Sequence, residues 1–509
     1  MPKYLLGIDN GGTVAKAGLF TTEGRELAVA ARKSDMDSPR PGWVERDMER
    51  LWQATAESIR AVLAEAKIDP RDIAGIACAG HGNGIYLVDE RGCPVRPGIG
   101  SPDVRAREYI DRWKAAGVHQ AVLPKTMQSL WPGQPNALLA WLRDNEPETM
   151  KRARWVLMCK DYIRFRLTGQ IDSELTDASG TSLMDVGTGQ YDMGVLEAFG
   201  LADMRRLLPP VRRSEEVCGT VTSQAAAETG LAEGIPVAGG LFDIDASALA
   251  SGLVDESQMG LTVGTWSISQ YVSATPIVDE NIFMTSRYCI PGHYLMLEAS
   301  PTSASNLEWF VTQFFQSERA ALQGQDKSVY DLCNDLVATV KPEDVGIVFL
   351  PFLFASNAHP DAKAAFVGLT GWHERGHVLR AIYEGVAFGH HTHVDRLMRF
   401  RNLPETIRLT GGAARSQVWV QLFADVFQTP IEIPAGTELG ALGCAICASV
   451  AAGIYPDYHR AAEAMVNVAR VQKPNNALGT LYAKKYERYQ KVLAALGPVW
   501  GELQDSLKS

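Results

Sequence analysis

Short apolar segments interrupted by polar turns open the chain, and their length and spacing predict β-strands. The first three strands are expected to form an antiparallel meander, since only short turns separate them. A helix is expected over residues 48–66, because apolar residues recur there at helical spacing and Asp47 precedes them as an N-cap. The expected strands of this part cover residues 4–8, 15–20, 26–31, 73–77 and 85–88. Strands alternating with helices predict an α/β fold.

The second half of the chain continues this alternation. A boundary near residues 246–256 is expected to separate an N-terminal lobe, 1–247, from a C-terminal lobe, 248–509, although no Pro/Gly/Ser-rich linker marks it. Expected elements of the second lobe are strands near Leu261 and Ser269, an apolar segment at 345–354, a helix at 378–399, a strand at 407–410, a helix at 417–427, and an outer helix at about 478–509.

Two glycine turns, half a chain apart, each separate a pair of apolar strands. The first is Asp9-Asn10-Gly11-Gly12-Thr13, and the second contains Gly264-Thr265. Glycine permits positive φ and leaves amide groups free to face an anion. Either turn alone is equally typical of an ordinary β-hairpin. Together they predict two phosphate-binding hairpins in two similar lobes.

Composition narrows the possible functions. A net charge of -10 and a pI near 5.6 argue against a nucleic-acid partner, which normally requires a concentrated basic face. No signal peptide and no apolar run of about 20 residues is visible, so a cytoplasmic protein without a membrane partner is expected. The eight cysteines are widely spaced and are expected to be free thiols. Cys444 and Cys447 lie in a small-residue helix at 440–453 and are expected in the core.

Asp243 and Asp245 follow an apolar strand and precede a run of small residues typical of a helix. Carboxylates at the end of a strand are well placed for catalysis. The alternative is that an aspartate here merely caps the helix, and the local sequence alone favours capping.

The whole chain resembles the FGGY family of carbohydrate kinases, and within it the branch of ketopentose kinases that includes xylulokinases and L-xylulose kinases. The resemblance implies two duplicated actin-like ATPase lobes, ribonuclease H-like in fold, with an ATP and sugar cleft between them. It rests on motifs in one order along the chain: Asp9–Thr13, Lys160–Tyr162, Leu167–Gly169, Thr176–Ser179, Asp243, Gly264–Thr265, Leu350–Phe352, Gly411–Ala413, Trp419, Ala424–Asp425 and Gly440–Gly443.

The resemblance also decides between the two aspartates. In the family the catalytic aspartate has a glycine nine residues on and often an acidic residue twelve on, and Asp243 meets this spacing with Gly252 and Asp255. Asp243 is therefore expected to accept the proton of the sugar hydroxyl as it attacks ATP. The resemblance implies that Asp9, together with Asp243, holds Mg²⁺.

The resemblance further implies two groups of ATP-binding residues. The phosphates are expected to contact Gly11, Gly12, Thr13, Lys16, Gly264 and Thr265, and the adenosine to be flanked by Gly411, Gly412, Ala413 and Ser416. An exposed strand-edge lysine is an equally good interpretation of Lys16. Without the family match, Gly411 and Gly412 would merely end a strand.

The expected sugar-binding residues are His81, Asn83, Asp103, Trp131 and Asp243. His81 and Asn83 stand where the family has the Gln and His of a Gln-Met-His-Gly turn, and both can hydrogen-bond sugar hydroxyls. Asp103 keeps a family aspartate, while Ser101 replaces an aromatic residue. Trp131 is expected to stack on the sugar, with a structural role nearly as well supported.

These features predict an ATP-dependent kinase for the terminal hydroxyl of a ketopentose, with L-xylulose as the first choice. D-xylulose, ribulose, a polyol or a keto-acid sugar are alternative acceptors. The non-kinase alternative is an actin-like switch driven by ATP. A homodimer is a further possibility, because dimers are common among oligomers generally.

Overall fold

The computed structural model describes residues 3–356, 358–359 and 361–505. The chain forms two compact units that are both discontinuous in sequence. The first contains the chain up to Val254 together with 272–296 and 436–466, and the second contains 255–271, 297–435 and the chain from Asn467 on. The lobe boundary between residues 247 and 248 stays a prediction.

The first unit is built on a sheet that begins with the expected meander. Strands β1 (Tyr4–Asn10), β2 (Val14–Thr21) and β3 (Glu26–Lys33) pair antiparallel, and this register sets Asp9 opposite Lys16. The sheet order is β13 (Val217–Thr220), β14 (Pro236–Ala238), β5 (Ile73–Gly80), β1, β2 and β3, with β15 (Leu241–Phe242) pairing parallel to the end of β5. The ends of β1, β5 and β15 thereby come together.

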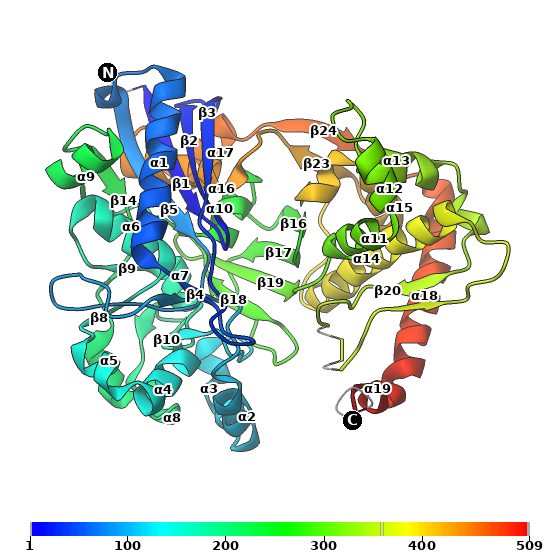
Figure 1. The fold of residues 1–509 in the computed structure, drawn as a ribbon, viewed down its shortest axis with the longest axis horizontal. Helices are drawn as coiled ribbons and strands as arrows, with labels where there is room; N and C mark the ends of the chain where they lie inside the picture. Colours follow the sequence, from blue (N-terminus) through cyan, green and yellow to red (C-terminus); the bar gives the residue numbers. More distant parts are fainter. Residues whose placement is uncertain (1–2, 357, 360, 506–509) are drawn as a thin grey trace. The chain divides into compact units, whose positions relative to one another are not determined.

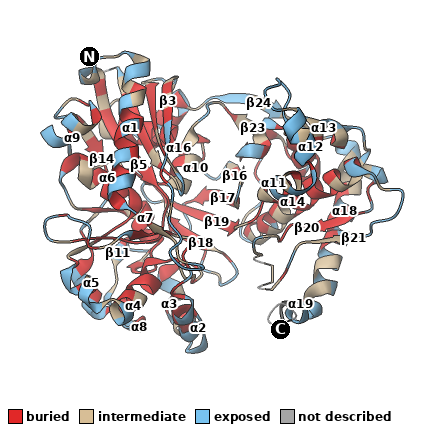
Figure 2. Ribbon diagram, viewed as in Figure 1, coloured by how far each residue is buried: buried red, intermediate tan, exposed pale blue. Residues whose placement is uncertain are grey.

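Helices cover both faces of this sheet with apolar side chains (Figure 2). One face is covered by α1 (Met48–Ala66), α6 (Cys159–Thr168) and α9 (Ser223–Thr229), and the other by α10 (Asp243–Ala250), α16 (Leu439–Ala451) and α17 (Tyr458–Met465). The prediction of α1 is confirmed, including the Asp47 cap, whose carboxylate accepts from the amides of Glu49 and Arg50.

Helix α16 comes from the far end of the sequence yet lies beside the first strands, as its orange ribbon against the blue strands shows (Figure 1). Small residues allow this approach. A Cβ on Gly7 would lie 1.9 Å from the carbonyl oxygen of Ala441, and one on Gly443 would lie 2.0 Å from that of Ala246. Cys444 and Cys447 are buried free thiols, as expected for core residues.

Between β5 and β14 the chain builds a second apolar cluster of the first unit, which includes Leu138, Leu142 and Leu196. The sequence pattern predicted little of this region. Its elements, with the short β4 that precedes them, are β4 (Glu45–Arg46), β6 (Tyr86–Val88), β7 (Gly98–Ile99), α2 (Arg107–Ala115), α3 (Val118–Thr126), α4 (Pro135–Asn145), α5 (Pro147–Arg152), β8 (Trp155–Leu157), β9 (Ser173–Glu174), α7 (Leu175–Ser179), β10 (Met184–Asp185), β11 (Gln190–Tyr191), α8 (Met193–Ala198) and β12 (Val211–Arg212).

The second unit also contains a sheet whose first pair is a hairpin. Strands β16 (Gln258–Val263) and β17 (Ser267–Ser273) pair antiparallel, and β22 (Thr406–Thr410) runs parallel to β16, as β5 does to β1. The order continues from β22 to β23 (Ile431–Pro434) and β24 (Val468–Gln472). The predicted likeness of the two hairpin regions is thus confirmed at the level of strand pairing.

The expected helices of the second unit are present with shifted ends. The helix predicted at 378–399 is α14 (Arg375–Leu397), and the one at 417–427 is α15 (Gln417–Phe427). The predicted outer tail forms α18 (Gly479–Leu496) and α19 (Trp500–Asp505), and its residues 506–509 lie outside the described part. The remaining elements of the second unit are α11 (Ser305–Phe314), α12 (Gln316–Ala321), α13 (Val329–Ala338), β20 (Val348–Leu350) and β21 (Ala365–Val367), while β18 (Met284–Arg287) lies in the first unit and β19 (Tyr294–Ser300) crosses from the first to the second.

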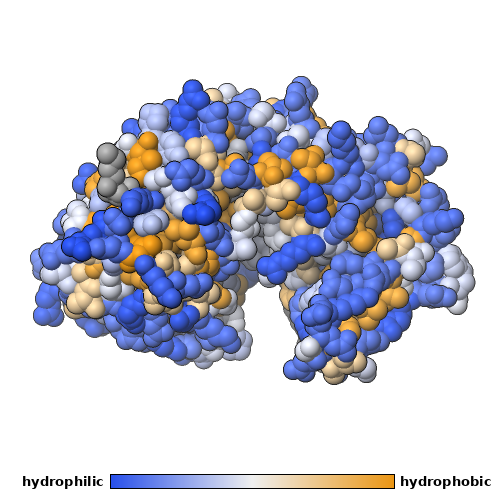
Figure 3. Space-filling model, turned by 90° about the horizontal axis from the view of Figure 1, so that it is seen from above, coloured by the Kyte–Doolittle hydropathy of each residue, from blue (hydrophilic) through white to orange (hydrophobic). Residues whose placement is uncertain are grey.

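The face of the molecule seen in Figure 3 is mainly hydrophilic, with apolar side chains in small separate groups. Within the described residues, no helix is both long enough and apolar enough to cross a membrane.

Candidate active site

The first glycine hairpin joins β1 to β2, and a buried arginine holds it from behind. The Gly11 amide donates to the carbonyl of Val14 at 3.1 Å, which closes the turn. Arg46, only 1% exposed, donates through Nη2 to the carbonyls of Gly11 at 3.1 Å and Gly12. In the described part of the chain, the amides of Gly12 and Thr13 have no recorded acceptor. The hairpin therefore turns its carbonyls inward and keeps donors for an anion.

Sequence reasoning missed Arg46. It lies in the two-residue strand β4, just before the Asp47 cap, and no local pattern marks it as part of a phosphate site. Its guanidinium also donates to the carbonyl of Ser34 at 3.1 Å. Among the described residues, no carboxylate lies within ion-pair distance of Arg46; its polar partners are backbone carbonyls and, at 4.0 Å from Nη1, the sulfur of Cys159.

Lys16 lies opposite Asp9 on β2 and is partly exposed. Its Nζ lies 2.6 Å from Oε2 of Glu438, just before α16. Burial raises the pKa of the Asp9 carboxyl, the charge of Lys16 lowers it, and the charge of Glu438 raises it. The lysine is thus part of a charged group around Asp9, and its predicted phosphate contact stays a prediction.

Asp9 and Asp243 end neighbouring parts of the first sheet. Asp243 is the first residue of α10, directly after β15. Its side chain makes no capping hydrogen bond, and Phe242 occupies the N-cap position, so the capping alternative is wrong for Asp243. Burial first, and then the negative charges of Asp9 and Asp177, raise the pKa of the Asp243 carboxyl well above its usual range. The two carboxylates are therefore electrostatically coupled.

Helix α16 approaches Asp9 closely because it carries Gly440 in its first turn. A Cβ at this position would lie 2.4 Å from Oδ2 of Asp9. Oδ1 of Asp9 is buried and lacks a hydrogen-bond partner within the described chain. A buried carboxylate oxygen without a donor indicates a place for a cation or a water molecule.

Asp243 and Asp245 differ sharply in environment, although only Ile244 separates them. Asp243 keeps partial solvent exposure, whereas Asp245 is 0% exposed and neither of its oxygens has a hydrogen-bond partner among the described residues. Burial first, and then the charges of Glu174 and Asp177, raise the pKa of Asp245 well above its usual range. Asp245 is therefore an interior group without polar partners among the described residues, and Asp243 is the aspartate accessible to a substrate.

Behind these residues lies a fully buried charged cluster on α6, β9 and α7. The Lys160 Nζ lies 3.0 Å from Asp161, 3.4 Å from Glu174 and 3.2 Å from Asp177. Thr176 links the cluster to the start of α10, because its Oγ1 accepts from the Phe242 amide at 2.9 Å while its own hydroxyl donates to Glu174. The cluster thereby positions the start of α10.

Asp177 makes the stability of this cluster dependent on pH. Burial is the main cause that raises the pKa of Asp177 to about 7, from an ordinary value of 3.8. Between these values the folded chain binds a proton that the unfolded chain releases, so the free energy of unfolding falls as pH rises. We expect this contribution to change by roughly 4 kcal/mol at most from pH 4 to 7.

Urea unfolding of the wild type and Asp177→Asn across this pH range measures the effect. The variant should show a flatter profile, while Asp111→Asn, which alters an exposed carboxylate on α2, should follow the wild type. Parallel profiles for the wild type and Asp177→Asn would contradict the assignment.

His81 and Asn83 follow β5 in the glycine-rich loop, and both are buried. The His81 Nε2 lies 2.9 Å from the hydroxyl of Tyr86. Burial and the charge of Arg46 lower the pKa of His81 to about 3, so the imidazole is neutral at physiological pH. Asn83 adopts φ 60°, and in the described chain its buried Oδ1 has no hydrogen-bond partner. An unpartnered acceptor is well suited to a ligand hydroxyl.

Asp103 and Trp131 have structural partners in the same unit. The carboxylate of Asp103 accepts from the Val44 amide at 2.6 Å and from Nε and Nη2 of Arg105 at 2.9 and 2.8 Å. Its oxygens thus hold a buried ion pair. Trp131 is partly exposed and meets Phe283 edge to face, with ring centroids 6.0 Å apart. The sugar contacts of both residues stay predictions.

The second hairpin, between β16 and β17, is held from behind in a similar way. The carbonyl of Gly264 accepts from the Ala304 amide at 2.9 Å, and that of Thr265 accepts from the Ser305 hydroxyl at 3.1 Å. The Gly264 amide donates weakly to the Trp266 carbonyl at 3.3 Å. Both hairpins therefore have carbonyls engaged by donors of their own unit, and this similarity was not visible in the sequence.

A cavity of about 870 Å³ opens beside the second hairpin within the second unit. Gly264, Thr265, Gly412 and Ser416 line it, whereas Gly411 and Ala413 do not. Among the other lining residues are Leu307, Glu308, Trp309, Tyr330, Asn334, Phe354, Tyr383, Arg415 and Trp419. A Cβ on Gly411, which has φ +87°, would lie 2.6 Å from the Val263 carbonyl oxygen, so glycine is required where β22 passes the hairpin. The cavity is of a size that suits a nucleoside.

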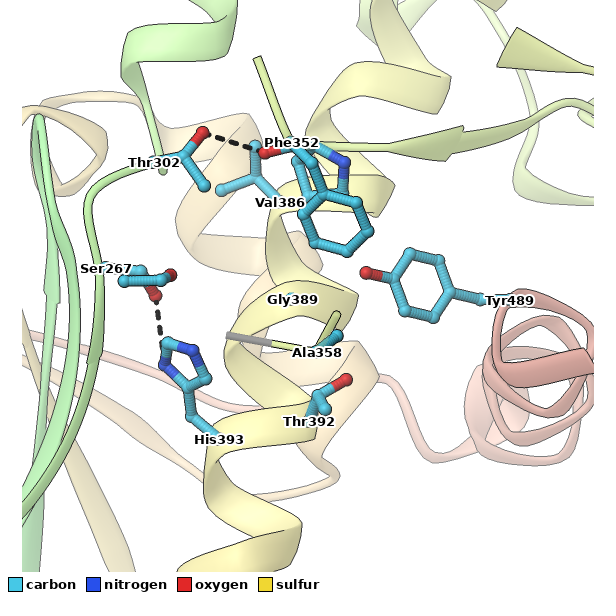
Figure 4. A pocket seen from close by; sticks show the side chains of 11 residues that line it. Ser267, Thr302, Phe352, Ala358, Val386, Gly389, Thr392, His393 and Tyr489 are labelled. Carbon is cyan, nitrogen blue, oxygen red and sulfur yellow. Dashed lines mark hydrogen bonds between the residues drawn. The ribbon is translucent and has the colours of Figure 1, made fainter. Parts of the chain in front are cut away.

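A second, much smaller cavity of about 10 Å³ lies behind β17 (Figure 4). Ser267 contacts His393 there at 3.3 Å, and Tyr489 lies on the opposite side of the cavity with its hydroxyl pointing into it (Figure 4). The neighbouring His390 lies 3.1 Å from Ser267 and Ser303, and burial lowers its pKa to about 3. This volume admits about one water molecule, so the cavity supports the strand rather than binding a substrate.

Known proteins share this architecture over the full chain. A model of the N-terminal domain of the FGGY family of carbohydrate kinases matches residues 4–250, and a model of the C-terminal domain matches residues 259–452. The L-xylulose/3-keto-L-gulonate kinase of Escherichia coli is 39% identical, with 97% of this chain and 98% of that protein aligned. A probable L-xylulose kinase of Pasteurella multocida is 37% identical, over 97% and 99% of the two chains.

A solved structure agrees with these matches. The xylulose kinase of Rhodospirillum rubrum superposes with a TM-score of 0.87 at 27% identity, over 98% of this chain and 100% of that chain. Two α/β units with paired phosphate-type hairpins, an accessible aspartate and a nucleoside-sized cavity define a sugar kinase of the actin-like ATPase fold. The chain belongs to the FGGY family of carbohydrate kinases.

Family membership confirms the predicted fold class and the predicted enzyme class. It implies ATP as the phosphoryl donor and a small sugar as the acceptor. The actin-like switch is therefore not favoured.

Proposed function

We propose that the protein transfers the γ-phosphoryl group of ATP to the terminal hydroxyl of L-xylulose. The observation that supports this reaction is the accessible Asp243 at the start of α10. The charge of Asp9 acts on its carboxyl, and the Thr176 hydroxyl oxygen accepts from the preceding Phe242 amide and so anchors the start of the helix. The names of the relatives in Escherichia coli and Pasteurella multocida favour L-xylulose as the acceptor.

Asp243 accepts the proton of the attacking hydroxyl. Its partial exposure admits the sugar, and its carboxylate stands at the start of α10 as the proton acceptor. The neutral His81 and the unpartnered Oδ1 of Asn83 orient the sugar hydroxyls. Trp131 covers an apolar face of the sugar.

The residues present fit a magnesium ion. Mg²⁺ commonly binds through one or two carboxylates while keeping water molecules and phosphate oxygens as its other ligands. Asp9, with its unpartnered buried oxygen, and Asp243 are such a pair, and the described residues contain no larger group of metal-ligating side chains. When bound, the ion neutralises charge on the phosphates.

Each unit has its own elements suited to the nucleotide. In the first, the amides of the Gly11–Thr13 hairpin suit phosphate oxygens; in the second, those of the Gly264–Thr265 hairpin do, and the cavity lined by Gly412 and Ser416 receives the adenosine. Most of the rate enhancement then comes from alignment and charge neutralisation, since the transition state of phosphoryl transfer is loose.

A keto-acid sugar is the second candidate acceptor, because the name of the Escherichia coli relative includes 3-keto-L-gulonate. D-xylulose, ribulose and polyols remain alternatives to be tested. A cytoplasmic location and a homodimer stay predictions.

A coupled assay of ADP release tests the proposal. Mg-ATP is supplied with L-xylulose, D-xylulose, ribulose, pentitols, glycerol or keto-acid sugars, and a reaction without sugar is the control. L-xylulose should give the highest kcat/KM. A higher kcat/KM for another acceptor would assign that acceptor as the substrate. ADP release that is equal with and without sugar would contradict a kinase function.

A further inference from the structure

One side chain in the large cavity of the second unit is held in a single orientation by two hydroxyl groups. Asn334, on α13, accepts through Oδ1 from the hydroxyl of Tyr383 at 2.9 Å and from the hydroxyl of Ser416 at 2.6 Å. All three residues line the cavity. The carbonyl oxygen of an amide has two lone pairs, and both are used here.

The two hydroxyl donors are themselves fixed. Ser416 is the N-cap of α15, and its Oγ accepts from the Trp419 amide at 3.1 Å, so its own proton is directed toward Asn334. Tyr383 stacks on Trp419 with ring centroids 4.3 Å apart and an interplanar angle of 19°. The Trp419 indole also donates to the Tyr383 carbonyl at 3.2 Å. Three helices thereby determine the orientation of the amide.

This arrangement leaves the amide nitrogen of Asn334 available. Within the described residues, no acceptor is recorded for Nδ2. Two nearby carboxylates are already engaged: Glu308 accepts from Tyr330 and from Arg319 at 3.0 Å, and Asp331 accepts from Ser328 at 2.7 Å. The cavity therefore contains an oriented donor whose partner must come from a ligand or from water.

We propose that Nδ2 of Asn334 donates a hydrogen bond to a ring nitrogen of the purine base, with Tyr383 and Ser416 as its positioning residues. The inference rests on the proposed function, because it assumes that the adenosine of ATP occupies this cavity. A preoriented donor costs little to order on binding, so a single amide can discriminate between bases that differ in their acceptors.

Calorimetric binding of ADP to the purified full chain tests the donor directly. Asn334→Ala should weaken ADP binding about 10-fold, in line with the loss of one well-oriented hydrogen bond. Asn334→Asp should weaken it at least as much, since the carboxylate still accepts from Tyr383 and Ser416 but donates nothing. Asn402→Ala is the matched control, because Asn402 is an exposed asparagine of the same unit that does not line the cavity.

The role of Tyr383 is tested by a double-mutant cycle. Tyr383→Phe should weaken ADP binding about 3-fold in the wild type and have no further effect in Asn334→Ala, because it acts only through the amide. Additive effects would overturn the positioning role.

Base analogues identify the acceptor atom. One of 1-deaza-, 3-deaza- and 7-deaza-ADP should bind the wild type at least 5-fold more weakly than ADP and lose this difference in Asn334→Ala. Equal losses in both proteins would overturn the assignment. Unchanged ADP binding in Asn334→Ala and Asn334→Asp would overturn the role of Asn334 and leave the proposed function intact. A wild type that binds no purine nucleotide would contradict both the role of Asn334 and the proposed kinase function.

Discussion

Replacing Asp243 with asparagine is expected to lower kcat for sugar phosphorylation by roughly 10²- to 10⁴-fold, the range that general-base catalysis supplies. Asparagine matches the shape of aspartate but cannot accept the proton of the attacking hydroxyl. The variant should fold, because Asp243 makes no capping hydrogen bond and the start of α10 is anchored through the Phe242 amide. Steady-state kinetics, with calorimetric ADP binding as a check, measure the effect.

Asp245→Asn is the matched control on the same helix. Asp245 is fully buried and out of reach of a substrate, so its amide analogue should keep kcat within a few fold of the wild type. Loss of turnover in Asp245→Asn together with normal turnover in Asp243→Asn would transfer the role of base to Asp245. Equal thermal stability of Asp243→Asn and the wild type would exclude misfolding as the cause.

Replacing Arg46 with methionine is expected to lower kcat/KM for ATP about 100-fold. The guanidinium donates to the carbonyls of Gly11, Gly12 and Ser34, and removing it leaves the buried Ser34 carbonyl unsatisfied, at about 1–3 kcal/mol, and the two hairpin carbonyls without their shared donor. The hairpin should then relax by turning carbonyls outward and losing the orientation of its amides. The loss should therefore affect ATP turnover more than the binding of adenosine, whose proposed cavity lies in the second unit.

Arg46→Lys provides the control for Arg46→Met. Lysine keeps a charged donor but lacks the forked geometry that reaches several carbonyls at once, so partial activity is expected. Kinetics, adenosine binding and thermal melting should be measured on both variants. A folded Arg46→Met with normal kcat/KM would show that the hairpin holds its shape without the guanidinium.

Local signals in the sequence were sufficient to predict the two hairpins and several of the helices. Strands β1 and β2, and likewise β16 and β17, are short apolar segments on either side of a glycine turn, so their pairing depends on neighbouring residues alone. Helix α1 was predicted with its cap, because both the periodicity and Asp47 are local features. The predicted bounds of α14, 378–399, differ from the observed Arg375–Leu397. The tertiary contacts that extend a helix are not encoded in its periodicity.

The environment of the two aspartates required the tertiary structure. The sequence places Asp243 and Asp245 two positions apart, and the family spacing selected Asp243. Their different exposure follows from the direction in which α10 enters the core, with Asp245 facing the Glu174 and Asp177 carboxylates. Burial then raises the pKa of Asp245, and burial depends on the whole fold.

By itself, the sequence determined the class of fold, the two glycine hairpins and the candidate base, because turn chemistry, periodicity and motif order are written in consecutive residues. Only the tertiary structure decided that Arg46 holds the first hairpin, that Gly440 lets α16 approach Asp9, and that Ser416 orients Asn334. These contacts join residues far apart along the chain. Their distances result from the packing of helices on a sheet, which no local pattern specifies.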